Sequence, residues 1–195
     1  MISPTNAAIG PGRLVLIAGP SGAGKDTLLD RAKAACNAEQ SVIFARRVVT
    51  RRATEAEDHD SLDESAFMRA AAAGDFALWW EAHGLKYGIA KEIDESLRAG
   101  CAVVCNVSRG TIPAARRRYG SVTAVLITAP ADVLTRRLLS RNRATDHSLT
   151  DRLARNLDYT TMDYDHVIEN IHDVAHGAEQ LRAIIMSHIN SGVRS

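Results

Sequence analysis

The sequence predicts an α/β fold of the P-loop type, in which a parallel sheet carries helices on both faces. Short apolar runs of the kind that form buried strands alternate with helical segments along most of the 195 residues. A glycine-rich loop, residues 19–25, lies between the first apolar run and the first helical segment, which places it at the carboxyl edge where such sheets bind ligands. The 46% hydrophobic content is enough for one domain, residues 1–195, with a sizeable core.

The predicted strands are apolar runs without the alternation of a half-exposed sheet. They are residues 13–18, 41–45, 101–105, 121–127 and the shorter 166–168. Runs of this kind favour strands that are buried on both faces of a parallel sheet. The first twelve residues are rich in Pro, Gly and Ala and have no period, which predicts a loose leader before the first strand.

Helices are predicted between these strands from caps, stops and spacing. Residues 27–33 follow the glycine-rich loop, and residues 93–99 end at Gly100. Ser61 and Glu64 have the spacing of a capping box, which predicts a helix that runs to about Ala73 and stops at Gly74. Near the C-terminus, apolar residues recur at the three- and four-residue intervals of an amphipathic helix, namely Val174, Ala178, Leu181 and Ile185.

Two stretches depart from simple alternation. The first, about residues 50–90, contains a helix from Asp63, the run 76–80 and a predicted turn at Tyr87-Gly88, and we interpret it as a small insert. The second, about residues 136–155, is dense in arginine and is predicted to form a lid from a pair of short helices.

Charge and composition exclude several functions. The formal net charge is +1, so no long-range attraction toward nucleic acid or an anionic membrane is expected. The three cysteines form no C-x-x-C pair, and two of them lie in an apolar run, which predicts buried, reduced thiols. No charged-then-apolar leader opens the chain, and no apolar run approaches the roughly 20 residues of a membrane span. A cytoplasmic protein is therefore expected, and the oligomeric state stays open.

The glycine-rich loop carries the chemistry. It reads Gly19-Pro20-Ser21-Gly22-Ala23-Gly24-Lys25-Asp26-Thr27 and nearly completes the phosphate-binding pattern G-x-x-x-x-G-K-[ST]. Glycines let successive backbone N–H groups turn toward phosphate oxygens, and Lys25 adds a charge that reaches the outer phosphates. Asp26 stands where a hydroxyl residue normally ligates Mg²⁺, and its carboxylate either complements the helix dipole or serves as a Mg²⁺ ligand.

Positive groups that converge on a transferred phosphate are the other requirement of phosphoryl transfer. The predicted lid supplies them in Arg136, Arg137, Arg141 and Arg143, with Arg152 and Arg155 after them. A solvated helix face would explain any single one of these arginines, whereas the cluster as a unit favours contact with phosphate.

Taken in order, these segments resemble guanylate kinases from about residue 13 to residue 185. The matching segments are residues 19–25, Thr50-Arg51, residues 74–76, Tyr87-Gly88, Arg137 to Arg141, Arg152 and residues 164–170. The match is closer to the ribose 1,5-bisphosphate phosphokinase family, which Gly24-Lys25-Asp26, Thr50-Arg51 and residues 80–88 and 106–109 resemble. That family phosphorylates ribose 1,5-bisphosphate with ATP, which implies a role in the synthesis of 5-phosphoribosyl 1-diphosphate and in phosphonate metabolism.

The resemblance implies roles for individual residues. Lys25 would hold the β- and γ-phosphates of ATP, and Arg137, Arg141 and Arg152 would close on the transferred group. Asn170 lies where this fold approaches adenine, although an ordinary Asn at a strand end is equally consistent. In guanylate kinases the strand matching residues 101–105 runs into acidic residues, which are absent here, and that absence favours Asp26 as the Mg²⁺ ligand.

The resemblance also implies a phosphorylated sugar as acceptor. The two positions with which guanylate kinases read guanine fall on Leu78 and Ile89, and neither side chain can form a hydrogen bond with a base. Arg51 would hold one phosphate of ribose 1,5-bisphosphate, Ser108 and Arg109 the other, with His59 and Tyr87 as hydrogen-bonding groups. A guanylate kinase, or a protein-binding module of the same fold, is the alternative.

Overall fold

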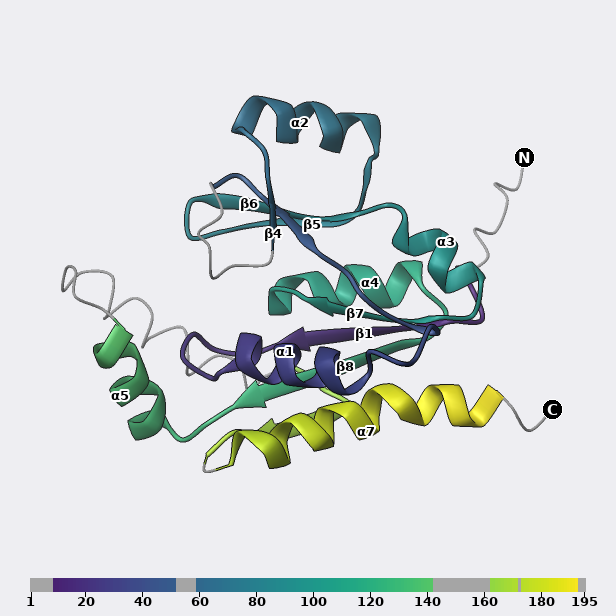
Figure 1. Ribbon diagram of the computed structural model, residues 1–195. Helices are drawn as coiled ribbons and strands as arrows, with labels where there is room; N and C mark the ends of the chain where they lie inside the picture. The colour runs from purple at the N-terminus through teal and green to yellow at the C-terminus, as the bar shows by residue number, and fades with distance from the viewer. Residues whose placement is uncertain (1–8, 52–58, 142–161, 172, 193–195) are drawn as a thin grey trace. The chain divides into compact units, whose positions relative to one another are not determined.

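The computed structural model describes residues 9–51, 59–141, 162–171 and 173–192 (Figure 1). The chain divides into two compact units. Unit 1 comprises residues 1–15, 41–105 and 110–122, and unit 2 comprises residues 16–40, 106–109 and 123–195.

The main sheet has five parallel strands. In spatial order they are β2 (Val42–Phe44), β7 (Ala102–Asn106), β1 (Arg13–Ala18), β8 (Val122–Thr128) and β9 (His166–Glu169). β1 is the central strand, and five of its six residues are buried. The predicted strands and the α/β class are therefore confirmed, and no strand boundary moves by more than one residue.

Helices α1 (Lys25–Ala35) and α7 (Val174–Gly192) pack against each other in unit 2. Gly177 of α7 lies against Leu28 of α1, where an added Cβ would be 3.0 Å from the leucine Cδ2 atom. Of the four residues predicted to form the apolar stripe of α7, Ala178, Leu181 and Ile185 are buried and Val174 is half-buried. α5 (Ala131–Arg141) also belongs to unit 2.

A second, four-stranded sheet lies in unit 1 and corresponds to the predicted insert (Figure 1). Its strand order is β4 (His59–Ser61), β3 (Arg47–Val49), β6 (Leu85–Ala90) and β5 (Phe76–Ala82). β3 and β4 are parallel, whereas β6 is antiparallel to both β3 and β5. α2 (Glu64–Ala73) packs on this sheet through Phe67, whose ring stacks on that of Phe76 with 4.6 Å between the centroids.

The capping box predicted for α2 is wrong. Asp63 is the N-cap residue, and its carboxylate accepts a hydrogen bond of 2.7 Å from the backbone N–H of Ala66. Ser61 instead belongs to β4, where it is the partner of Val49. Because Ser61 pairs in a sheet, it cannot also cap the helix. The predicted stop at Gly74 is confirmed, since this glycine has the left-handed φ of +77° that ends many helices.

The predicted turn at Tyr87-Gly88 is also wrong. Both residues lie inside β6, and the hairpin turns at His83 and Gly84, which have φ angles of +56° and +70°. Two successive positive φ angles suit the tight turn that joins twisted antiparallel strands. Gly88 has another function, because a Cβ at this position would lie 2.6 Å from the ring of Phe76.

Residues 9–12 are bound to the rest of unit 1, which corrects the prediction of a loose leader for this part. Ile9 forms a parallel bridge with Tyr119, and the N–H of Gly12 donates to the carbonyl oxygen of Leu97. Residues 1–8 lie outside the described residues. Leu97 belongs to α3 (Ile93–Arg98), and Tyr119 directly follows α4 (Ile112–Arg118).

A buried carboxylate joins α3 to the end of α4. Asp94 is 2% exposed, and it accepts hydrogen bonds from the hydroxyl of Tyr119 at 2.7 Å and from Nη2 of Arg118 at 2.6 Å. Burial, together with the hydrogen bond to Asp94, raises the pKa of Tyr119, so this hydroxyl stays protonated and donates.

The three cysteines, all within the described residues, carry free thiols, as predicted; Cys36 and Cys105 are buried, whereas Cys101 is half-buried. No helix in the described part of the chain combines the length and the apolar content that a membrane crossing requires.

Candidate active site

The phosphate loop follows β1 at the carboxyl edge of the main sheet, as predicted. At Gly19 the φ angle is +155°, and a Cβ would collide with the carbonyl oxygen of Ile127 in the neighbouring strand β8. At Gly24 the φ angle is +82°, and a Cβ would collide with Nδ2 of Asn170. Only glycine satisfies both the backbone conformation and the space at these positions.

α1 begins at Lys25, with Gly24 as its N-cap residue and no side chain capping it. The first backbone N–H groups of a helix have no partner within the helix, and the helix dipole is positive at this end. A helix that starts directly after a glycine-rich loop therefore offers N–H donors and positive potential to an anion.

The ammonium group of Lys25 already lies at this loop. Nζ donates to the carbonyl oxygens of Gly19 and Pro20, at 2.8 Å each. The lysine side chain thus extends from the start of α1 back to Gly19 and Pro20, the first two residues of the loop.

Asp26 and Asn106 meet beside the loop. Nδ2 of Asn106, the last residue of β7, donates a 2.9 Å hydrogen bond to Oδ1 of Asp26. Asp26 is exposed in the first turn of α1. Asn106 was part of the segment 106–109 that resembles the family, but its contact with Asp26 was not predicted from the sequence. The available signal was the strand order of such folds, because β7 and β1 are neighbours and both end at this edge of the sheet.

Asn170 supports the loop from behind. It follows β9, is 3% exposed, and donates from Nδ2 to the carbonyl oxygen of Ala23 at 2.8 Å. Its Oδ1 atom is buried and has no hydrogen-bond partner among the described residues. Asn170 is therefore a buried component of the loop rather than a solvent-facing residue at a strand end, and its contact with adenine stays a prediction.

Of the predicted lid arginines, the structure brings Arg137 to the loop. Arg137 is half-buried in α5, and its Nη1 atom would lie 4.0 Å from a Cβ at Gly24. Arg136 is exposed and pairs with Asp132 one turn earlier in the helix, at 2.9 Å. Arg141 is the last residue of α5, and its side chain lies outside the described part of the structure, as do Arg143, Arg152 and Arg155. Their contact with phosphate stays a prediction.

The predicted acceptor residues of unit 1 lie in and beside the small sheet. Arg51 is exposed just beyond the end of β3, and Nε2 of the buried His59 lies 3.4 Å from its carbonyl oxygen. The ring of Tyr87 is stacked on that of Trp80, with the centroids 5.5 Å apart and the planes at 7°. His59 thus contacts the main chain of Arg51, and its contact with substrate stays a prediction.

Ser108 and Arg109 follow β7 in unit 2, the unit that also contains the phosphate loop. Both are half-buried, and Arg109 begins a short 3-10 helix, Arg109–Thr111. The N–H of Val107 donates to the carbonyl oxygen of Ile17, so this segment continues alongside β1 toward the loop.

A phosphate loop between the first strand and first helix of a parallel sheet, with an arginine beside it, is typical of P-loop nucleotide-binding proteins, a class that includes kinases. A family model described as "Guanylate kinase" matches residues 11–188. The fold is similar to that of a guanylate kinase from Anaplasma phagocytophilum, with a TM-score of 0.68, 20% identity, and coverage of 92% of this chain and 86% of the other.

Three relatives share the name ribose 1,5-bisphosphate phosphokinase PhnN. The protein from Rhodopseudomonas palustris is 50% identical over 92% of each chain. Those from Bradyrhizobium diazoefficiens and Pseudofrankia inefficax are 48% and 38% identical, over 91% of this chain and 90% and 93% of theirs. This chain belongs to the guanylate kinase family and, within it, to the ribose 1,5-bisphosphate phosphokinases.

Proposed function

We propose that the protein transfers the γ-phosphoryl group of ATP to ribose 1,5-bisphosphate, which yields 5-phospho-α-D-ribose 1-diphosphate and ADP. The observation that carries this assignment is the identity of about half of all residues, over nine-tenths of both chains, with a protein named for that reaction. The acceptor is a phosphorylated sugar, and the transferred group forms the second phosphate of a diphosphate.

The donor side of the reaction is assigned to the loop of unit 2. The N–H groups between Gly19 and Thr27 surround the phosphates of ATP, and Lys25 stabilises negative charge on the β- and γ-phosphates during transfer. Arg137, which the structure places by Gly24, approaches the same phosphates. Little covalent chemistry is required of the protein, because phosphoryl transfer is accelerated mainly by position and charge.

Mg²⁺ is the metal that fits this site. Asp26 presents an exposed carboxylate at the end of the loop, and Asn106 orients one of its oxygens. Mg²⁺ prefers oxygen ligands and usually keeps several waters, so one carboxylate and the phosphates of ATP are sufficient. Bound there, the ion would neutralise charge on the phosphates of ATP.

We predict that Asp26→Asn raises the Mg²⁺ concentration needed for half-maximal turnover by roughly tenfold or more, because a charged oxygen ligand becomes a neutral one. Turnover is measured against Mg²⁺ at fixed ATP. The control is Asp30→Asn, one turn further along the same helix, which should leave the Mg²⁺ dependence unchanged. An unaltered dependence in Asp26→Asn would leave the helix dipole as the reason for this carboxylate.

The acceptor assignment is supported by the two positions that match the guanine-reading residues of guanylate kinases. Leu78 and Ile89 are both buried and are cross-strand partners in the β5–β6 pair. Guanine would leave its donors and acceptors unpaired against such side chains, at a cost on the order of 1–3 kcal/mol for each lost partner. GMP should therefore be rejected.

The test is an analysis of products by mass. The protein is incubated with Mg-ATP and, in separate reactions, with ribose 1,5-bisphosphate, GMP, dGMP, AMP and ribose 5-phosphate. We expect 5-phospho-α-D-ribose 1-diphosphate from the first reaction and no nucleoside diphosphate derived from an acceptor. Efficient formation of GDP without the sugar product would assign the chain as a guanylate kinase. Binding of ATP without transfer to any acceptor would favour a protein-binding module.

A further inference from the structure

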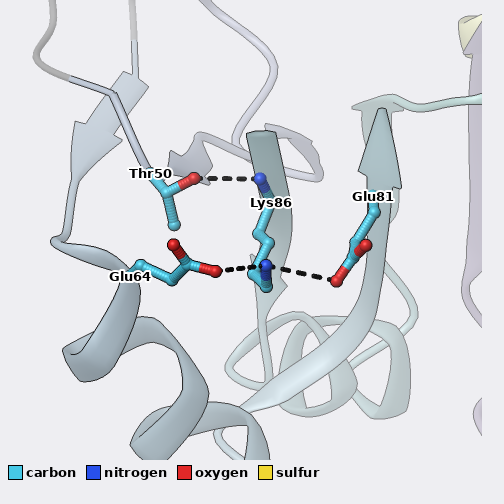
Figure 2. A network of polar contacts seen from close by, with 4 residues as sticks. All are labelled: Thr50, Glu64, Glu81 and Lys86. Atoms are coloured by element: carbon cyan, nitrogen blue, oxygen red, sulfur yellow. Dashed lines mark hydrogen bonds and ion pairs between the residues drawn. The ribbon is translucent and has the colours of Figure 1, made fainter. Parts of the chain in front are cut away.

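Lys86, a residue of β6, is the centre of a polar network in unit 1 (Figure 2). Its Nζ atom donates to Oε1 of Glu64 at 2.7 Å and lies 3.3 Å from Oε1 of Glu81. The Lys86 side chain is 16% exposed, whereas those of Glu64 and Glu81 are 72% and 62% exposed. The lysine is thus enclosed between two carboxylates that face solvent, one from the start of α2 and one from β5.

The main chain of Lys86 holds the end of β3. The backbone N–H of Thr50 donates to the carbonyl oxygen of Lys86 at 3.1 Å, and the N–H of Lys86 donates to Oγ1 of Thr50 at 2.9 Å (Figure 2). In an antiparallel pair the second bond normally ends on a backbone carbonyl. Here the threonine hydroxyl takes that place, so the β3–β6 ladder ends at Thr50.

Two predicted acceptor ligands adjoin this last pair. Arg51 directly follows Thr50, and Tyr87 directly follows Lys86. Tyr87 is fixed on its other side by the stack on Trp80. The position of both ligands therefore depends on how firmly Thr50 and Lys86 hold each other and on how firmly β6 is held to α2 and β5.

We propose that Lys86 is a positioning residue for the acceptor, because it ties the start of α2, strand β5 and the end of β3 together beside Arg51 and Tyr87. This inference rests on the proposed function, since it takes Arg51 and Tyr87 as ligands of the sugar bisphosphate. It goes further by assigning a role in acceptor binding to a residue that does not itself touch the acceptor.

A direct contact between Lys86 and a substrate phosphate is the rival explanation, and charge argues against it. One ammonium and two carboxylates sum to a net charge of −1, which repels a phosphate. The hydrogen bond to Glu64, followed by that to Glu81, raises the pKa of Lys86, so the ion pairs persist at neutral pH.

The test compares Lys86→Met with the matched control Lys91→Met. Lys91 is exposed just after β6 and carries the same charge. We expect Lys86→Met to raise KM for ribose 1,5-bisphosphate by about tenfold to a hundredfold, because misplacement of a binding group by about 1 Å costs this much. KM for ATP should be unchanged, and Lys86→Arg, which retains the charge, should restore most of the lost affinity. Lys91→Met should behave as wild type.

A second readout does not depend on the identity of the acceptor. Hydrogen exchange of peptides covering residues 47–51 and 85–90, followed by mass spectrometry, should be faster in Lys86→Met than in Lys91→Met.

If Lys86→Met does not fold, Glu64→Gln removes one exposed carboxylate of the same network and should raise the same KM by a smaller factor. Unchanged exchange together with an unchanged acceptor KM would overturn the inference. Equal rises in both KM values would also do so, by indicating a general structural defect. A wild-type protein that yields no sugar product would refute the proposed function separately.

Discussion

Replacement of Lys25 by alanine is expected to lower kcat by about a hundredfold to a thousandfold, the usual loss when one preorganised donor to transition-state charge is removed. The ammonium group of Lys25 lies at the phosphate loop, before the N-terminus of α1, 2.8 Å from the carbonyl oxygens of Gly19 and Pro20. No second lysine adjoins it in the sequence. No neighbouring lysine can therefore replace this charge, and Arg137 beside Gly24 has its own proposed contact with the phosphates.

Turnover of ribose 1,5-bisphosphate at saturating Mg-ATP measures the effect of Lys25→Ala, and thermal unfolding shows whether the fold is intact. The matched control is Lys33→Ala, in the last turn of the same helix. It removes the same charge at the far end of α1 and should retain near-normal kcat. If Lys25→Ala also turned over normally while folded, the loop would not be the site of transfer.

Replacement of Asp94 by alanine is expected to lower the free energy of unfolding by about 3 kcal/mol. Breaking a buried ion pair by removing one member typically costs about 3–5 kcal/mol, and the lower end applies because Arg118 is partly solvated. Two donors, the Tyr119 hydroxyl and the Arg118 guanidinium, lose their acceptor in this variant. Tyr119 also bridges to Ile9, so residues 9–12 should become easier to cleave by protease.

Urea unfolding of a graded set checks this expectation. Tyr119→Phe removes one donor and leaves the ion pair, so it should cost about 1 kcal/mol. Glu95→Ala, at an exposed neighbouring position, should change stability by no more than about 0.5 kcal/mol. A loss for Asp94→Ala as small as that for Glu95→Ala would show that the buried carboxylate contributes nothing to stability.

The main sheet could be predicted from the sequence because its strands are buried on both faces. Residues 14–18, for example, have no exposed side chain to interrupt the apolar run. The phosphate loop could be predicted because its glycines and Lys25 meet a local requirement of backbone shape and charge. Such signals lie within one short segment, and the structure confirms them.

The small sheet was harder to predict, for a physical reason. β3 and β4 have three residues each, too few to show a period. Ser61 resembled a helix cap, but it pairs with Val49 and leaves the cap to Asp63. Gly88 resembled a turn residue, but it gives room to the ring of Phe76. In each case a tertiary contact determined the local structure, although the residue type alone favours a different one.

The candidate site shows the same division. Lys25, Asp26 and Arg137 could be predicted as candidates from motif and order, whereas the contact of Asn106 with Asp26 joins residues 80 positions apart. The hydrogen bond between Lys86 and Thr50 joins residues that are 36 positions apart. The order of β7 and β1 in the sheet brings Asn106 to Asp26, and the register of β3 and β6 brings Lys86 to Thr50. Neither contact has a local sequence pattern that predicts it.

The hydrogen bonds of Lys25 to Gly19 and Pro20 also affect the thermodynamics of nucleotide binding. A free lysine side chain loses up to about 2 kcal/mol of rotamer entropy when it becomes fixed. Here the side chain is ordered by the loop before any phosphate arrives, so this loss belongs to folding rather than to association. If Lys25 binds the phosphates as proposed, an incoming phosphate would exchange one set of oxygen acceptors for another around an ammonium group already in place. On this assignment, part of the entropic cost of binding a phosphate chain falls on folding of the free protein rather than on association.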